Sequence, residues 1–238
     1  MPCRSAARTH VGTVRQRNED AVLERAEIGL WAVADGAGGH ERGDYASSRI
    51  IEALREANGM LSGLSLVEEV KGSLAEVNRE LRARAATIGP DALIGSTVAV
   101  LVIFDDQCCC LWAGDSRLYR MRAGQLRQLS RDQSHVQDLV DRGEILPEEA
   151  ATHPMANIVT NLLGAFDRLV LEESHDRLEP GDVMLLCSDG LSGAVRDDEI
   201  ARILTESPLA AAADRLIERA LDQGARDNVS AVVVEYTR

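Results

Sequence analysis

Aspartates close or open several apolar runs of this sequence. Asp35 ends the run LWAVAD and is followed by glycines at 36, 38 and 39. Asp115 ends CLWAGD, Asp189 ends VMLLCSD, and Asp227 stands just before NVSAVVVEY. Each aspartate alone fits a turn, because Asp hydrogen-bonds its own backbone and tolerates turn geometry. Together they indicate a second interpretation, a metal site.

Carboxylates that converge in a partly desolvated place repel one another, which raises their pKa values unless a cation lies between them. An all-oxygen set favours a hard ion such as Mg²⁺, Mn²⁺ or Ca²⁺, and the lack of paired His or Cys argues against zinc. Several carboxylates need more than one ion. Such a site would permit two-metal chemistry, in which the ions hold phosphoryl oxygens and make a water nucleophilic.

The segment VRQRNED adds cationic side chains near the N-terminus. Arg15 and Arg17 could hold a phosphate by paired hydrogen bonds, while Glu19 and Asp20 could reach the same metal ions. For these residues alone, a solvated charged loop is the simpler interpretation, because charged side chains are mostly exposed. The residues by themselves leave both alternatives open.

Short Val/Ile-rich runs bounded by Gly or Asp predict buried strands. They lie at 28–34, 97–104, 108–113, 117–121, 182–188 and 229–236. Apolar residues spaced by three or four predict two amphipathic helices, at 50–61 and 67–81. A shorter helix is expected at 197–205, and Ser207 is expected to cap a last helix that has Pro208 at its first position and Gly224 just past its end. Strands with paired helices predict an α+β layering of sheet on sheet, covered outside by helix pairs.

The 131–166 segment differs from its surroundings. It is polar and is interrupted by Gly143, Pro147, Pro154 and Gly164. A long insertion of this kind is usually functional, so we expect it to lie over the domain. No repeat or linker divides the chain, and we therefore expect one domain over residues 1–238.

The composition excludes several classes of protein. A formal net charge of −13 argues against a nucleic-acid partner. The five cysteines form no CxxC pair, and the run at 108–110 predicts small buried side chains on a strand in a reduced protein. The N-terminus lacks an apolar signal region, and the longest apolar stretch, LIGSTVAVLVIF, is too short to span a bilayer. We expect a soluble, cytoplasmic protein without a membrane partner.

The order and spacing of six motifs make the chain similar, nearly end to end, to the bacterial form of the metal-dependent PP2C (PPM) family of serine/threonine protein phosphatases. The motifs are GTVRQRNED, VADGAGGHERGDYAS, GSTVAV, AGDSRLYR, LEPGDVMLLCSDGLSG and RDNVSAVVV. The resemblance implies a four-layer αββα fold, in which a central sandwich of two antiparallel sheets is flanked by pairs of antiparallel helices.

The resemblance also implies roles for individual residues. Asp35 matches the carboxylate that bridges two metal ions, and Gly36 the residue whose backbone carbonyl completes the shell of the second ion. Asp189 and Asp227 match ligands of the first ion, and Asp115 together with Asp189 matches a weaker third site.

Other matches lie at the edge of this centre. Glu19 and Asp20 match groups that contact the second ion directly or through water. Arg15 matches the phosphate-binding arginine, and the 131–166 segment matches a flap that shapes substrate access.

The implied reaction is direct hydrolysis of phosphoserine or phosphothreonine, with in-line attack by a metal-bridging water and no phosphoenzyme. Mn²⁺ or Mg²⁺ would serve as cofactor, as two ions or three. His40 is the nearest motif histidine and a candidate general acid, and water on the third metal is the alternative.

Three positions depart from the usual family pattern. Ala37 stands where methionine is common, which changes packing only. RDQSHV replaces the usual Asp-His-Ser pattern, and NIVTNLLGA carries Asn161 where arginine is common. The last two differences bear on substrate docking, while every metal position is retained.

The stretches ARTHVGTVRQRNEDA and EIGLWAVADGAGGH look most like family members associated with type VI secretion. In those systems the phosphatase opposes a Ser/Thr kinase that acts on a forkhead-associated scaffold protein. We expect phosphorylated protein substrates and a monomer.

The sequence is also compatible with two other functions. A non-catalytic phosphoprotein-binding module on the same fold is disfavoured by the complete set of metal positions. A phosphohydrolase of small molecules is the other, although GAGGH lacks the lysine and hydroxyl of a nucleotide-binding glycine loop.

Overall fold

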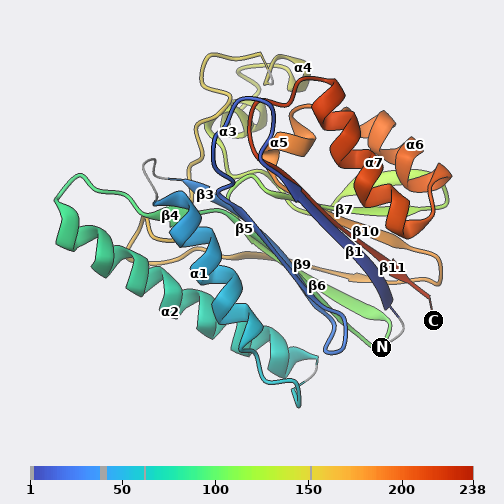
Figure 1. Ribbon diagram of the computed structural model, residues 1–238, viewed down its shortest axis with the longest axis horizontal. Coiled ribbons are helices and arrows are strands. Elements are labelled where there is room, and N and C mark those ends of the chain that lie inside the picture. Colours follow the sequence, from blue (N-terminus) through green and yellow to red (C-terminus); the bar gives the residue numbers. More distant parts are fainter. Residues whose placement is uncertain (1–2, 38–41, 62, 151, 238) are drawn as a thin grey trace.

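The computed structural model describes residues 3–37, 42–61, 63–150 and 152–237. Two antiparallel sheets pack face to face (Figure 1). The first contains, in spatial order, β1 (Cys3–His10), β11 (Val229–Tyr236), β10 (Val183–Cys187), β7 (Arg117–Arg122) and β8 (Gln125–Gln128). The second contains β2 (Asp20–Arg25), β3 (Leu30–Ala37), β5 (Val98–Phe104), β6 (Gln107–Ala113) and β9 (Glu172–Arg177), with β4 (Gly95–Ser96) paired to β3.

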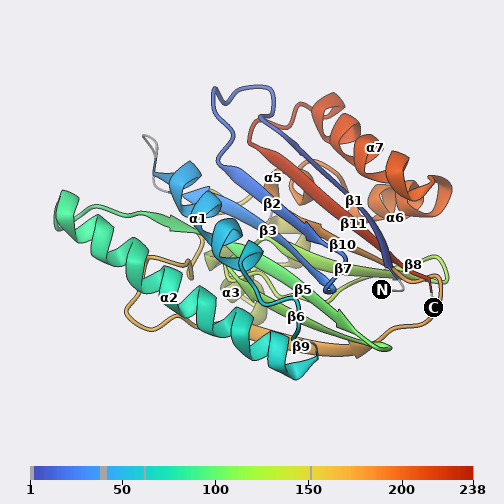
Figure 2. The same ribbon diagram turned by 60° about the horizontal axis from the view of Figure 1, so that its bottom comes forward.

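Helix pairs cover the two outer faces, as Figures 1 and 2 show from two directions. The second sheet is covered by α1 (Gly43–Arg55) and α2 (Leu64–Ile88). The first is covered by α6 (Asp197–Glu206) and α7 (Leu209–Asp222), and the short α5 (Asp189–Ser192) precedes them. These layers confirm the αββα architecture that the sequence predicted.

Strand β5 shows how the sequence builds these layers. Val100 and Val102 pack toward the helices, whereas Leu101 and Ile103 pack into the core between the sheets. Successive side chains of a strand point to opposite faces, so a continuous apolar run suits a sheet that is covered on both sides. The cysteine run of β6 follows the same rule. All three thiols are buried, which confirms the prediction that they act as small core residues.

Several element boundaries differ from the predictions. Strand β3 does not end at Asp35 but continues to Ala37, because β4 pairs with its last two residues. Helix α1 begins at Gly43, earlier than predicted, and ends at Arg55. Ser207 does not cap α7: Pro208 holds the N-cap position, and Ser207 is the C-cap of α6.

Strands β1, β2, β8 and β9 were not predicted from the sequence. Each is short or carries many polar residues, and all four lie at the edges of the two described sheets, where a strand has a paired neighbour on one side only. Their pairing depends on neighbours far away in the sequence rather than on an apolar run of their own.

The 131–166 segment contains α3 (His135–Asp141) and α4 (Pro147–Ala150). Its two ends meet through a bridge between Ser134 and Val159, and a second bridge joins Leu163 to Ser96. Among the helices of the described ranges, none combines the length and apolar character that a membrane span requires.

Candidate active site

Asp20 and Asp35 lie opposite each other on β2 and β3. Oδ2 of Asp20 accepts hydrogen bonds from the hydroxyls of Ser188 (2.7 Å) and Ser230 (2.6 Å). Its Oδ1 is buried and has no hydrogen-bond partner within the described chain. Burial raises the pKa of Asp20 to about 7, although both serine hydrogen bonds act in the opposite direction. One buried oxygen of this carboxyl is therefore left for another ligand.

Asp35 is held through its backbone by the segment that follows β4. Thr97 donates its N–H to the Asp35 carbonyl (2.8 Å), and its hydroxyl accepts from the Asp35 N–H (3.2 Å). The Ser96 hydroxyl also donates to the Asp35 carbonyl (2.9 Å). These three hydrogen bonds fix the Asp35 backbone. The Asp35 side chain lies among the carboxyls of Asp20, Asp189 and Asp115. Burial, followed by the charges of Asp20, Asp189 and Asp115, raises the pKa of Asp35 well above its ordinary value.

The remaining strand-end aspartates belong to the same group. Asp189 is the first residue of α5 and is separated from β10 by Ser188 alone, and its pKa is raised by burial and by Asp227. Asp115 follows β6, and burial together with the charge of Asp189 raises its pKa to about 7. We call Asp20, Asp35, Asp115 and Asp189 the aspartate cluster.

Asp227 and Arg15 lie at the more exposed rim of the cluster. Arg15 Nη2 is 2.7 Å from Asp227 Oδ2, and both side chains are about half exposed. The hydrogen bond and charge of Asp227 raise the pKa of Arg15, with smaller contributions from Glu19 and Asp35. Burial raises the pKa of Glu19, while Arg15 lowers it. A guanidinium thus stands beside the acidic group.

Asn228 fixes the loop that carries these rim residues, and sequence reasoning did not single it out. Its Nδ2 donates to the carbonyls of Val11 and Arg17, both at 2.9 Å, and its Oδ1 accepts from the Glu19 N–H at 2.7 Å. Ser188 and Ser230 were also missed. The available signal was a polar residue at or beside the end of an apolar strand, within three residues of Asp227 or Asp189.

Gly36 has no room for a side chain. A Cβ there would lie 2.1 Å from the carbonyl oxygen of Gly43 and 2.8 Å from that of Glu19. The Gly36 N–H donates to the same Glu19 carbonyl (3.1 Å). The glycine thus lets the start of α1 and the Glu19 backbone approach β3 closely. Gly38, Gly39 and His40 lie outside the described residues.

The cluster has the properties of a site for hard divalent cations. Every candidate ligand is an oxygen, and one buried Asp20 oxygen has no hydrogen-bond partner among the residues that the structure describes. Four carboxyls have raised pKa values because they crowd together away from water. Cations placed among them would remove the repulsion and restore the ionised forms.

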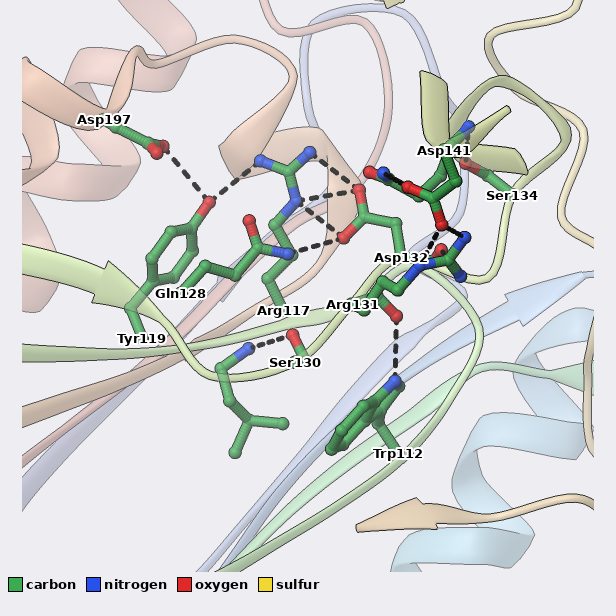
Figure 3. A network of polar contacts seen from close by, with 12 residues as sticks. Trp112, Arg117, Tyr119, Gln128, Ser130, Arg131, Asp132, Ser134, Asp141 and Asp197 are labelled. Carbon is green, nitrogen blue, oxygen red and sulfur yellow. Dashed lines mark hydrogen bonds and ion pairs between the residues drawn. The ribbon is translucent and has the colours of Figure 1, made fainter. Parts of the chain in front are cut away.

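A polar network fixes the start of the 131–166 segment (Figure 3). It lies near the aspartate cluster, since the charge of Asp132 contributes to the raised pKa of Asp115. Arg117 forms a two-pronged ion pair with Asp132 at 2.7–3.0 Å. Arg117 also donates to the Tyr119 hydroxyl (2.9 Å), which in turn donates to Asp197 (3.2 Å). The indole N–H of Trp112 donates to the Arg131 carbonyl (2.9 Å). Because Trp112 and Arg117 flank Asp115 in the chain, the segment is attached on both sides of that carboxyl.

The family model for protein phosphatase 2C matches residues 7–233. The chain belongs to the protein phosphatase 2C family. This is the family that the motifs predicted.

Named relatives of this protein phosphatase 2C chain agree. It is 37% identical to the serine/threonine protein phosphatase PstP of Mycobacterium tuberculosis over 98% of its own length, but it spans only 45% of that relative. It is 34% identical to the serine/threonine phosphatase stp of Listeria monocytogenes, with 96% of this chain and 94% of the relative covered.

Solved structures of the family match the whole fold. The structure described as "PppA, a key regulatory component of T6SS in Pseudomonas aeruginosa" superposes with a TM-score of 0.91 at 43% identity, covering 98% of this chain and 97% of that one. The catalytic domain of PstP "in complex with 2 Manganese ions" superposes with a TM-score of 0.89 at 35% identity, covering 99% of both chains. The two manganese ions of that relative agree with the cofactor expected from the sequence.

Proposed function

We propose that this chain hydrolyses phosphoserine and phosphothreonine in protein substrates, using two divalent cations held by Asp35, Gly36, Asp189 and Asp227. The observation that carries the proposal is the crowding of the aspartate cluster, whose buried carboxyls have raised pKa values. One of their oxygens, Asp20 Oδ1, has no hydrogen-bond partner in the described part of the chain. Asp115 with Asp189 would hold a weaker third ion. Glu19 and Asp20 would contact the second ion directly or through water.

The residues of the chain divide the work by position. When bound, Mn²⁺ or Mg²⁺ supplies Lewis acidity toward phosphoryl oxygens and lowers the pKa of water. Asp35 stands among Asp20, Asp115 and Asp189, and it is therefore suited to share its carboxyl between ions. Arg15 is half exposed at the rim, where its guanidinium can exchange Asp227 for a substrate phosphate by paired hydrogen bonds.

Proton delivery to the leaving hydroxyl stays a prediction. His40 is the candidate acid within the chain, and its position lies outside the described residues. Substitution by Gln would lower kcat and remove the basic limb of a bell-shaped pH profile if His40 donates the proton. A profile with that limb intact would favour water on the third ion.

Phosphate release from a phosphothreonine peptide tests the function. We expect turnover with Mn²⁺ and none with excess chelator, and faster turnover of the phosphopeptide than of a free nucleotide. Tight Mn²⁺ binding without turnover would instead support a phosphoprotein-binding module. A preference for the small ester would support a small-molecule phosphohydrolase.

The finer assignments rest on resemblance. The 43% identical structure described as a T6SS regulator supports a role in type VI secretion, in which this phosphatase would oppose a Ser/Thr kinase that modifies a forkhead-associated scaffold protein. We propose a cytoplasmic, monomeric protein with one domain over 1–238, in which the 131–166 segment is the flap. Loss of the phosphatase should raise the phosphothreonine content of such a scaffold in cells.

A further inference from the structure

Gln133 joins the residue that precedes Asp115 to the 131–166 segment. The Gly114 N–H donates to Gln133 Oε1 (2.8 Å), and the Gln133 N–H donates to the Gly114 carbonyl (3.0 Å). Gln133 is only 6% exposed, so water does not replace these bonds readily. Both hydrogen-bonding groups of the Gly114 backbone are thus fixed by one residue.

On its other side, Gly114 packs closely against Thr97. Its φ is +106°, and a Cβ at this position would lie 2.7 Å from the Thr97 side chain. Thr97 in turn holds the Asp35 backbone. Gly114 therefore lies between a residue that holds Asp35 on one side and Gln133 on the other.

The same glutamine side chain reaches the other end of the 131–166 segment. Oε1 of Gln133 also accepts from Asn161 Nδ2 (2.8 Å), and the Gln133 carbonyl accepts from the Thr160 N–H (2.8 Å). Its Nε2 donates to Glu172 on β9 (3.1 Å). Asn161 Nδ2 donates further to the Val170 carbonyl (2.7 Å). One buried amide oxygen thus serves both Gly114 and Asn161.

We propose that Gln133 is a positioning residue that sets the place of the Asp115 carboxyl through Gly114 and couples it to the 131–166 segment through Asn161. The inference rests on the proposed function, in which Asp115 holds the weaker third ion. A shift of the segment that displaces Gln133 would break its hydrogen bonds to the Gly114 N–H and carbonyl, and the freed Gly114 peptide would carry Asp115 with it. Affinity for the weak ion and placement of the segment are therefore linked.

The Arg117–Asp132 pair cannot replace this contact. It anchors the start of the segment on the β7 side, whereas Gln133 bonds directly to the peptide next to Asp115. Removal of the glutamine amide leaves a buried Gly114 N–H without its acceptor, while the Arg117–Asp132 ion pair stays intact. A substitution of Gln133 therefore tests its contact to Gly114 separately from the anchoring by the ion pair.

The first test compares Gln133→Leu with Gln137→Leu. Gln137 is a glutamine of the same segment. Within the part of the chain that the structure describes, its side chain forms one hydrogen bond, to Asp141. In metal-free protein we expect amide exchange of Gly114 and of the 158–162 stretch to rise about tenfold or more in Gln133→Leu, as for loss of one buried hydrogen bond. Calorimetric titration with Mn²⁺ should show weak-site affinity reduced severalfold and tight-site affinity unchanged. Gln137→Leu should match the parent in both measurements.

A double-mutant cycle with Asp115→Asn gives the second test. If Gln133 acts through Asp115, Gln133→Leu should lower kcat in the parent background and change it little when Asp115 is already Asn. Equal loss in both backgrounds, or unchanged weak-site affinity with unchanged Gly114 exchange, would overturn the proposal.

Two controls keep these outcomes distinct. If Gln133→Leu does not fold, Asn161→Ala keeps the bonds between Gln133 and Gly114 and removes the bonds from Asn161 to Gln133 and to the Val170 carbonyl. Unchanged weak Mn²⁺ affinity in that variant would contradict the coupling. Exchange and Mn²⁺ binding do not require turnover. A parent protein that binds Mn²⁺ but does not hydrolyse phosphopeptide would therefore contradict the proposed function without deciding the role of Gln133.

Discussion

Asp20 and Asp35 face each other directly in the register of β2 and β3. Directly opposed residues of an antiparallel pair have Cβ atoms about 5 Å apart, a separation at which like charges destabilise a sheet. The fold tolerates the pair because the backbone of Asp35 is anchored by Thr97 and Asp20 is hydrogen-bonded by two serines. The pair of carboxyls therefore lowers the stability of the metal-free protein while it serves the proposed metal binding.

Asp35→Asn should abolish most activity and stabilise the metal-free protein. The substitution removes the charge repelled by Asp20, Asp189 and Asp115, while it deletes the proposed shared ligand. We expect kcat on a phosphothreonine peptide to fall about 100-fold or more and the melting temperature in chelator to rise. A variant that melts lower than the parent in chelator would contradict the electrostatic account.

The metal-free protein should lose stability as the pH rises from about 4 to about 7. The pKa values of Asp20 and Asp115 are raised from 3.8 to about 7 in the folded state. Between these values the folded state binds more protons than the unfolded state, so the free energy of unfolding decreases with pH, by on the order of a few kcal/mol. Urea unfolding in chelator at pH 5 and at pH 7.5 measures this decrease in the free energy of unfolding.

Asp20→Asn with Asp115→Asn should flatten this pH dependence, because the two titrating groups are gone. Mn²⁺ should restore stability at pH 7.5 in the parent, since it binds the folded state. Stability that increases from pH 5 to pH 7.5 in chelator would show that these carboxyls are not protonated in the fold.

Arg15→Ala should weaken substrate binding with little effect on folding. Its ion pair with Asp227 is half exposed, and such pairs contribute about 1 kcal/mol or less to stability. We expect KM for a phosphopeptide to rise about tenfold through loss of a charge-assisted phosphate contact. Arg4→Ala, which breaks an exposed pair with Glu235, is the matched control and should leave KM unchanged.

Asn228→Ala should destabilise the protein and lower its activity together. Three hydrogen bonds to the 11–19 loop are lost in a buried position. We expect the free energy of unfolding to decrease by about 2 kcal/mol or more. Asn58→Ala, at an exposed turn that accepts one N–H from Met60, should change it by less than about 0.5 kcal/mol. Similar effects of the two substitutions would contradict the assigned role.

Arg117→Ala should be far more damaging than Arg131→Ala, although both arginines pair with aspartates in Figure 3. The Asp132 side chain is 11% exposed, so removal of Arg117 leaves a mostly buried carboxylate uncompensated and should cost about 3 kcal/mol. The pair of Arg131 with Asp141 is exposed and should contribute about 1 kcal/mol or less. Urea unfolding of both variants tests the difference.

The sequence alone determined the buried strands, the layered fold class and the family. The apolar runs of β5, β10 and β11 are local signals, since side-chain burial on a covered strand needs no knowledge of its neighbours. The aspartates at the ends of these strands were predicted as metal ligands for the same reason, because the end of an apolar run is also a local signal. Their order along the chain, together with the motifs, was enough to indicate the family.

Only the tertiary structure decided how these candidates are held. Asp20 is bonded by Ser188 and Ser230, which are 168 and 210 residues away in the sequence. The need for glycine at position 36 arises from the approach of Gly43 and Glu19, and the role of Gln133 from its contacts to Gly114 and Asn161. Such contacts follow from how distant segments pack, and no residue pattern within one segment encodes them.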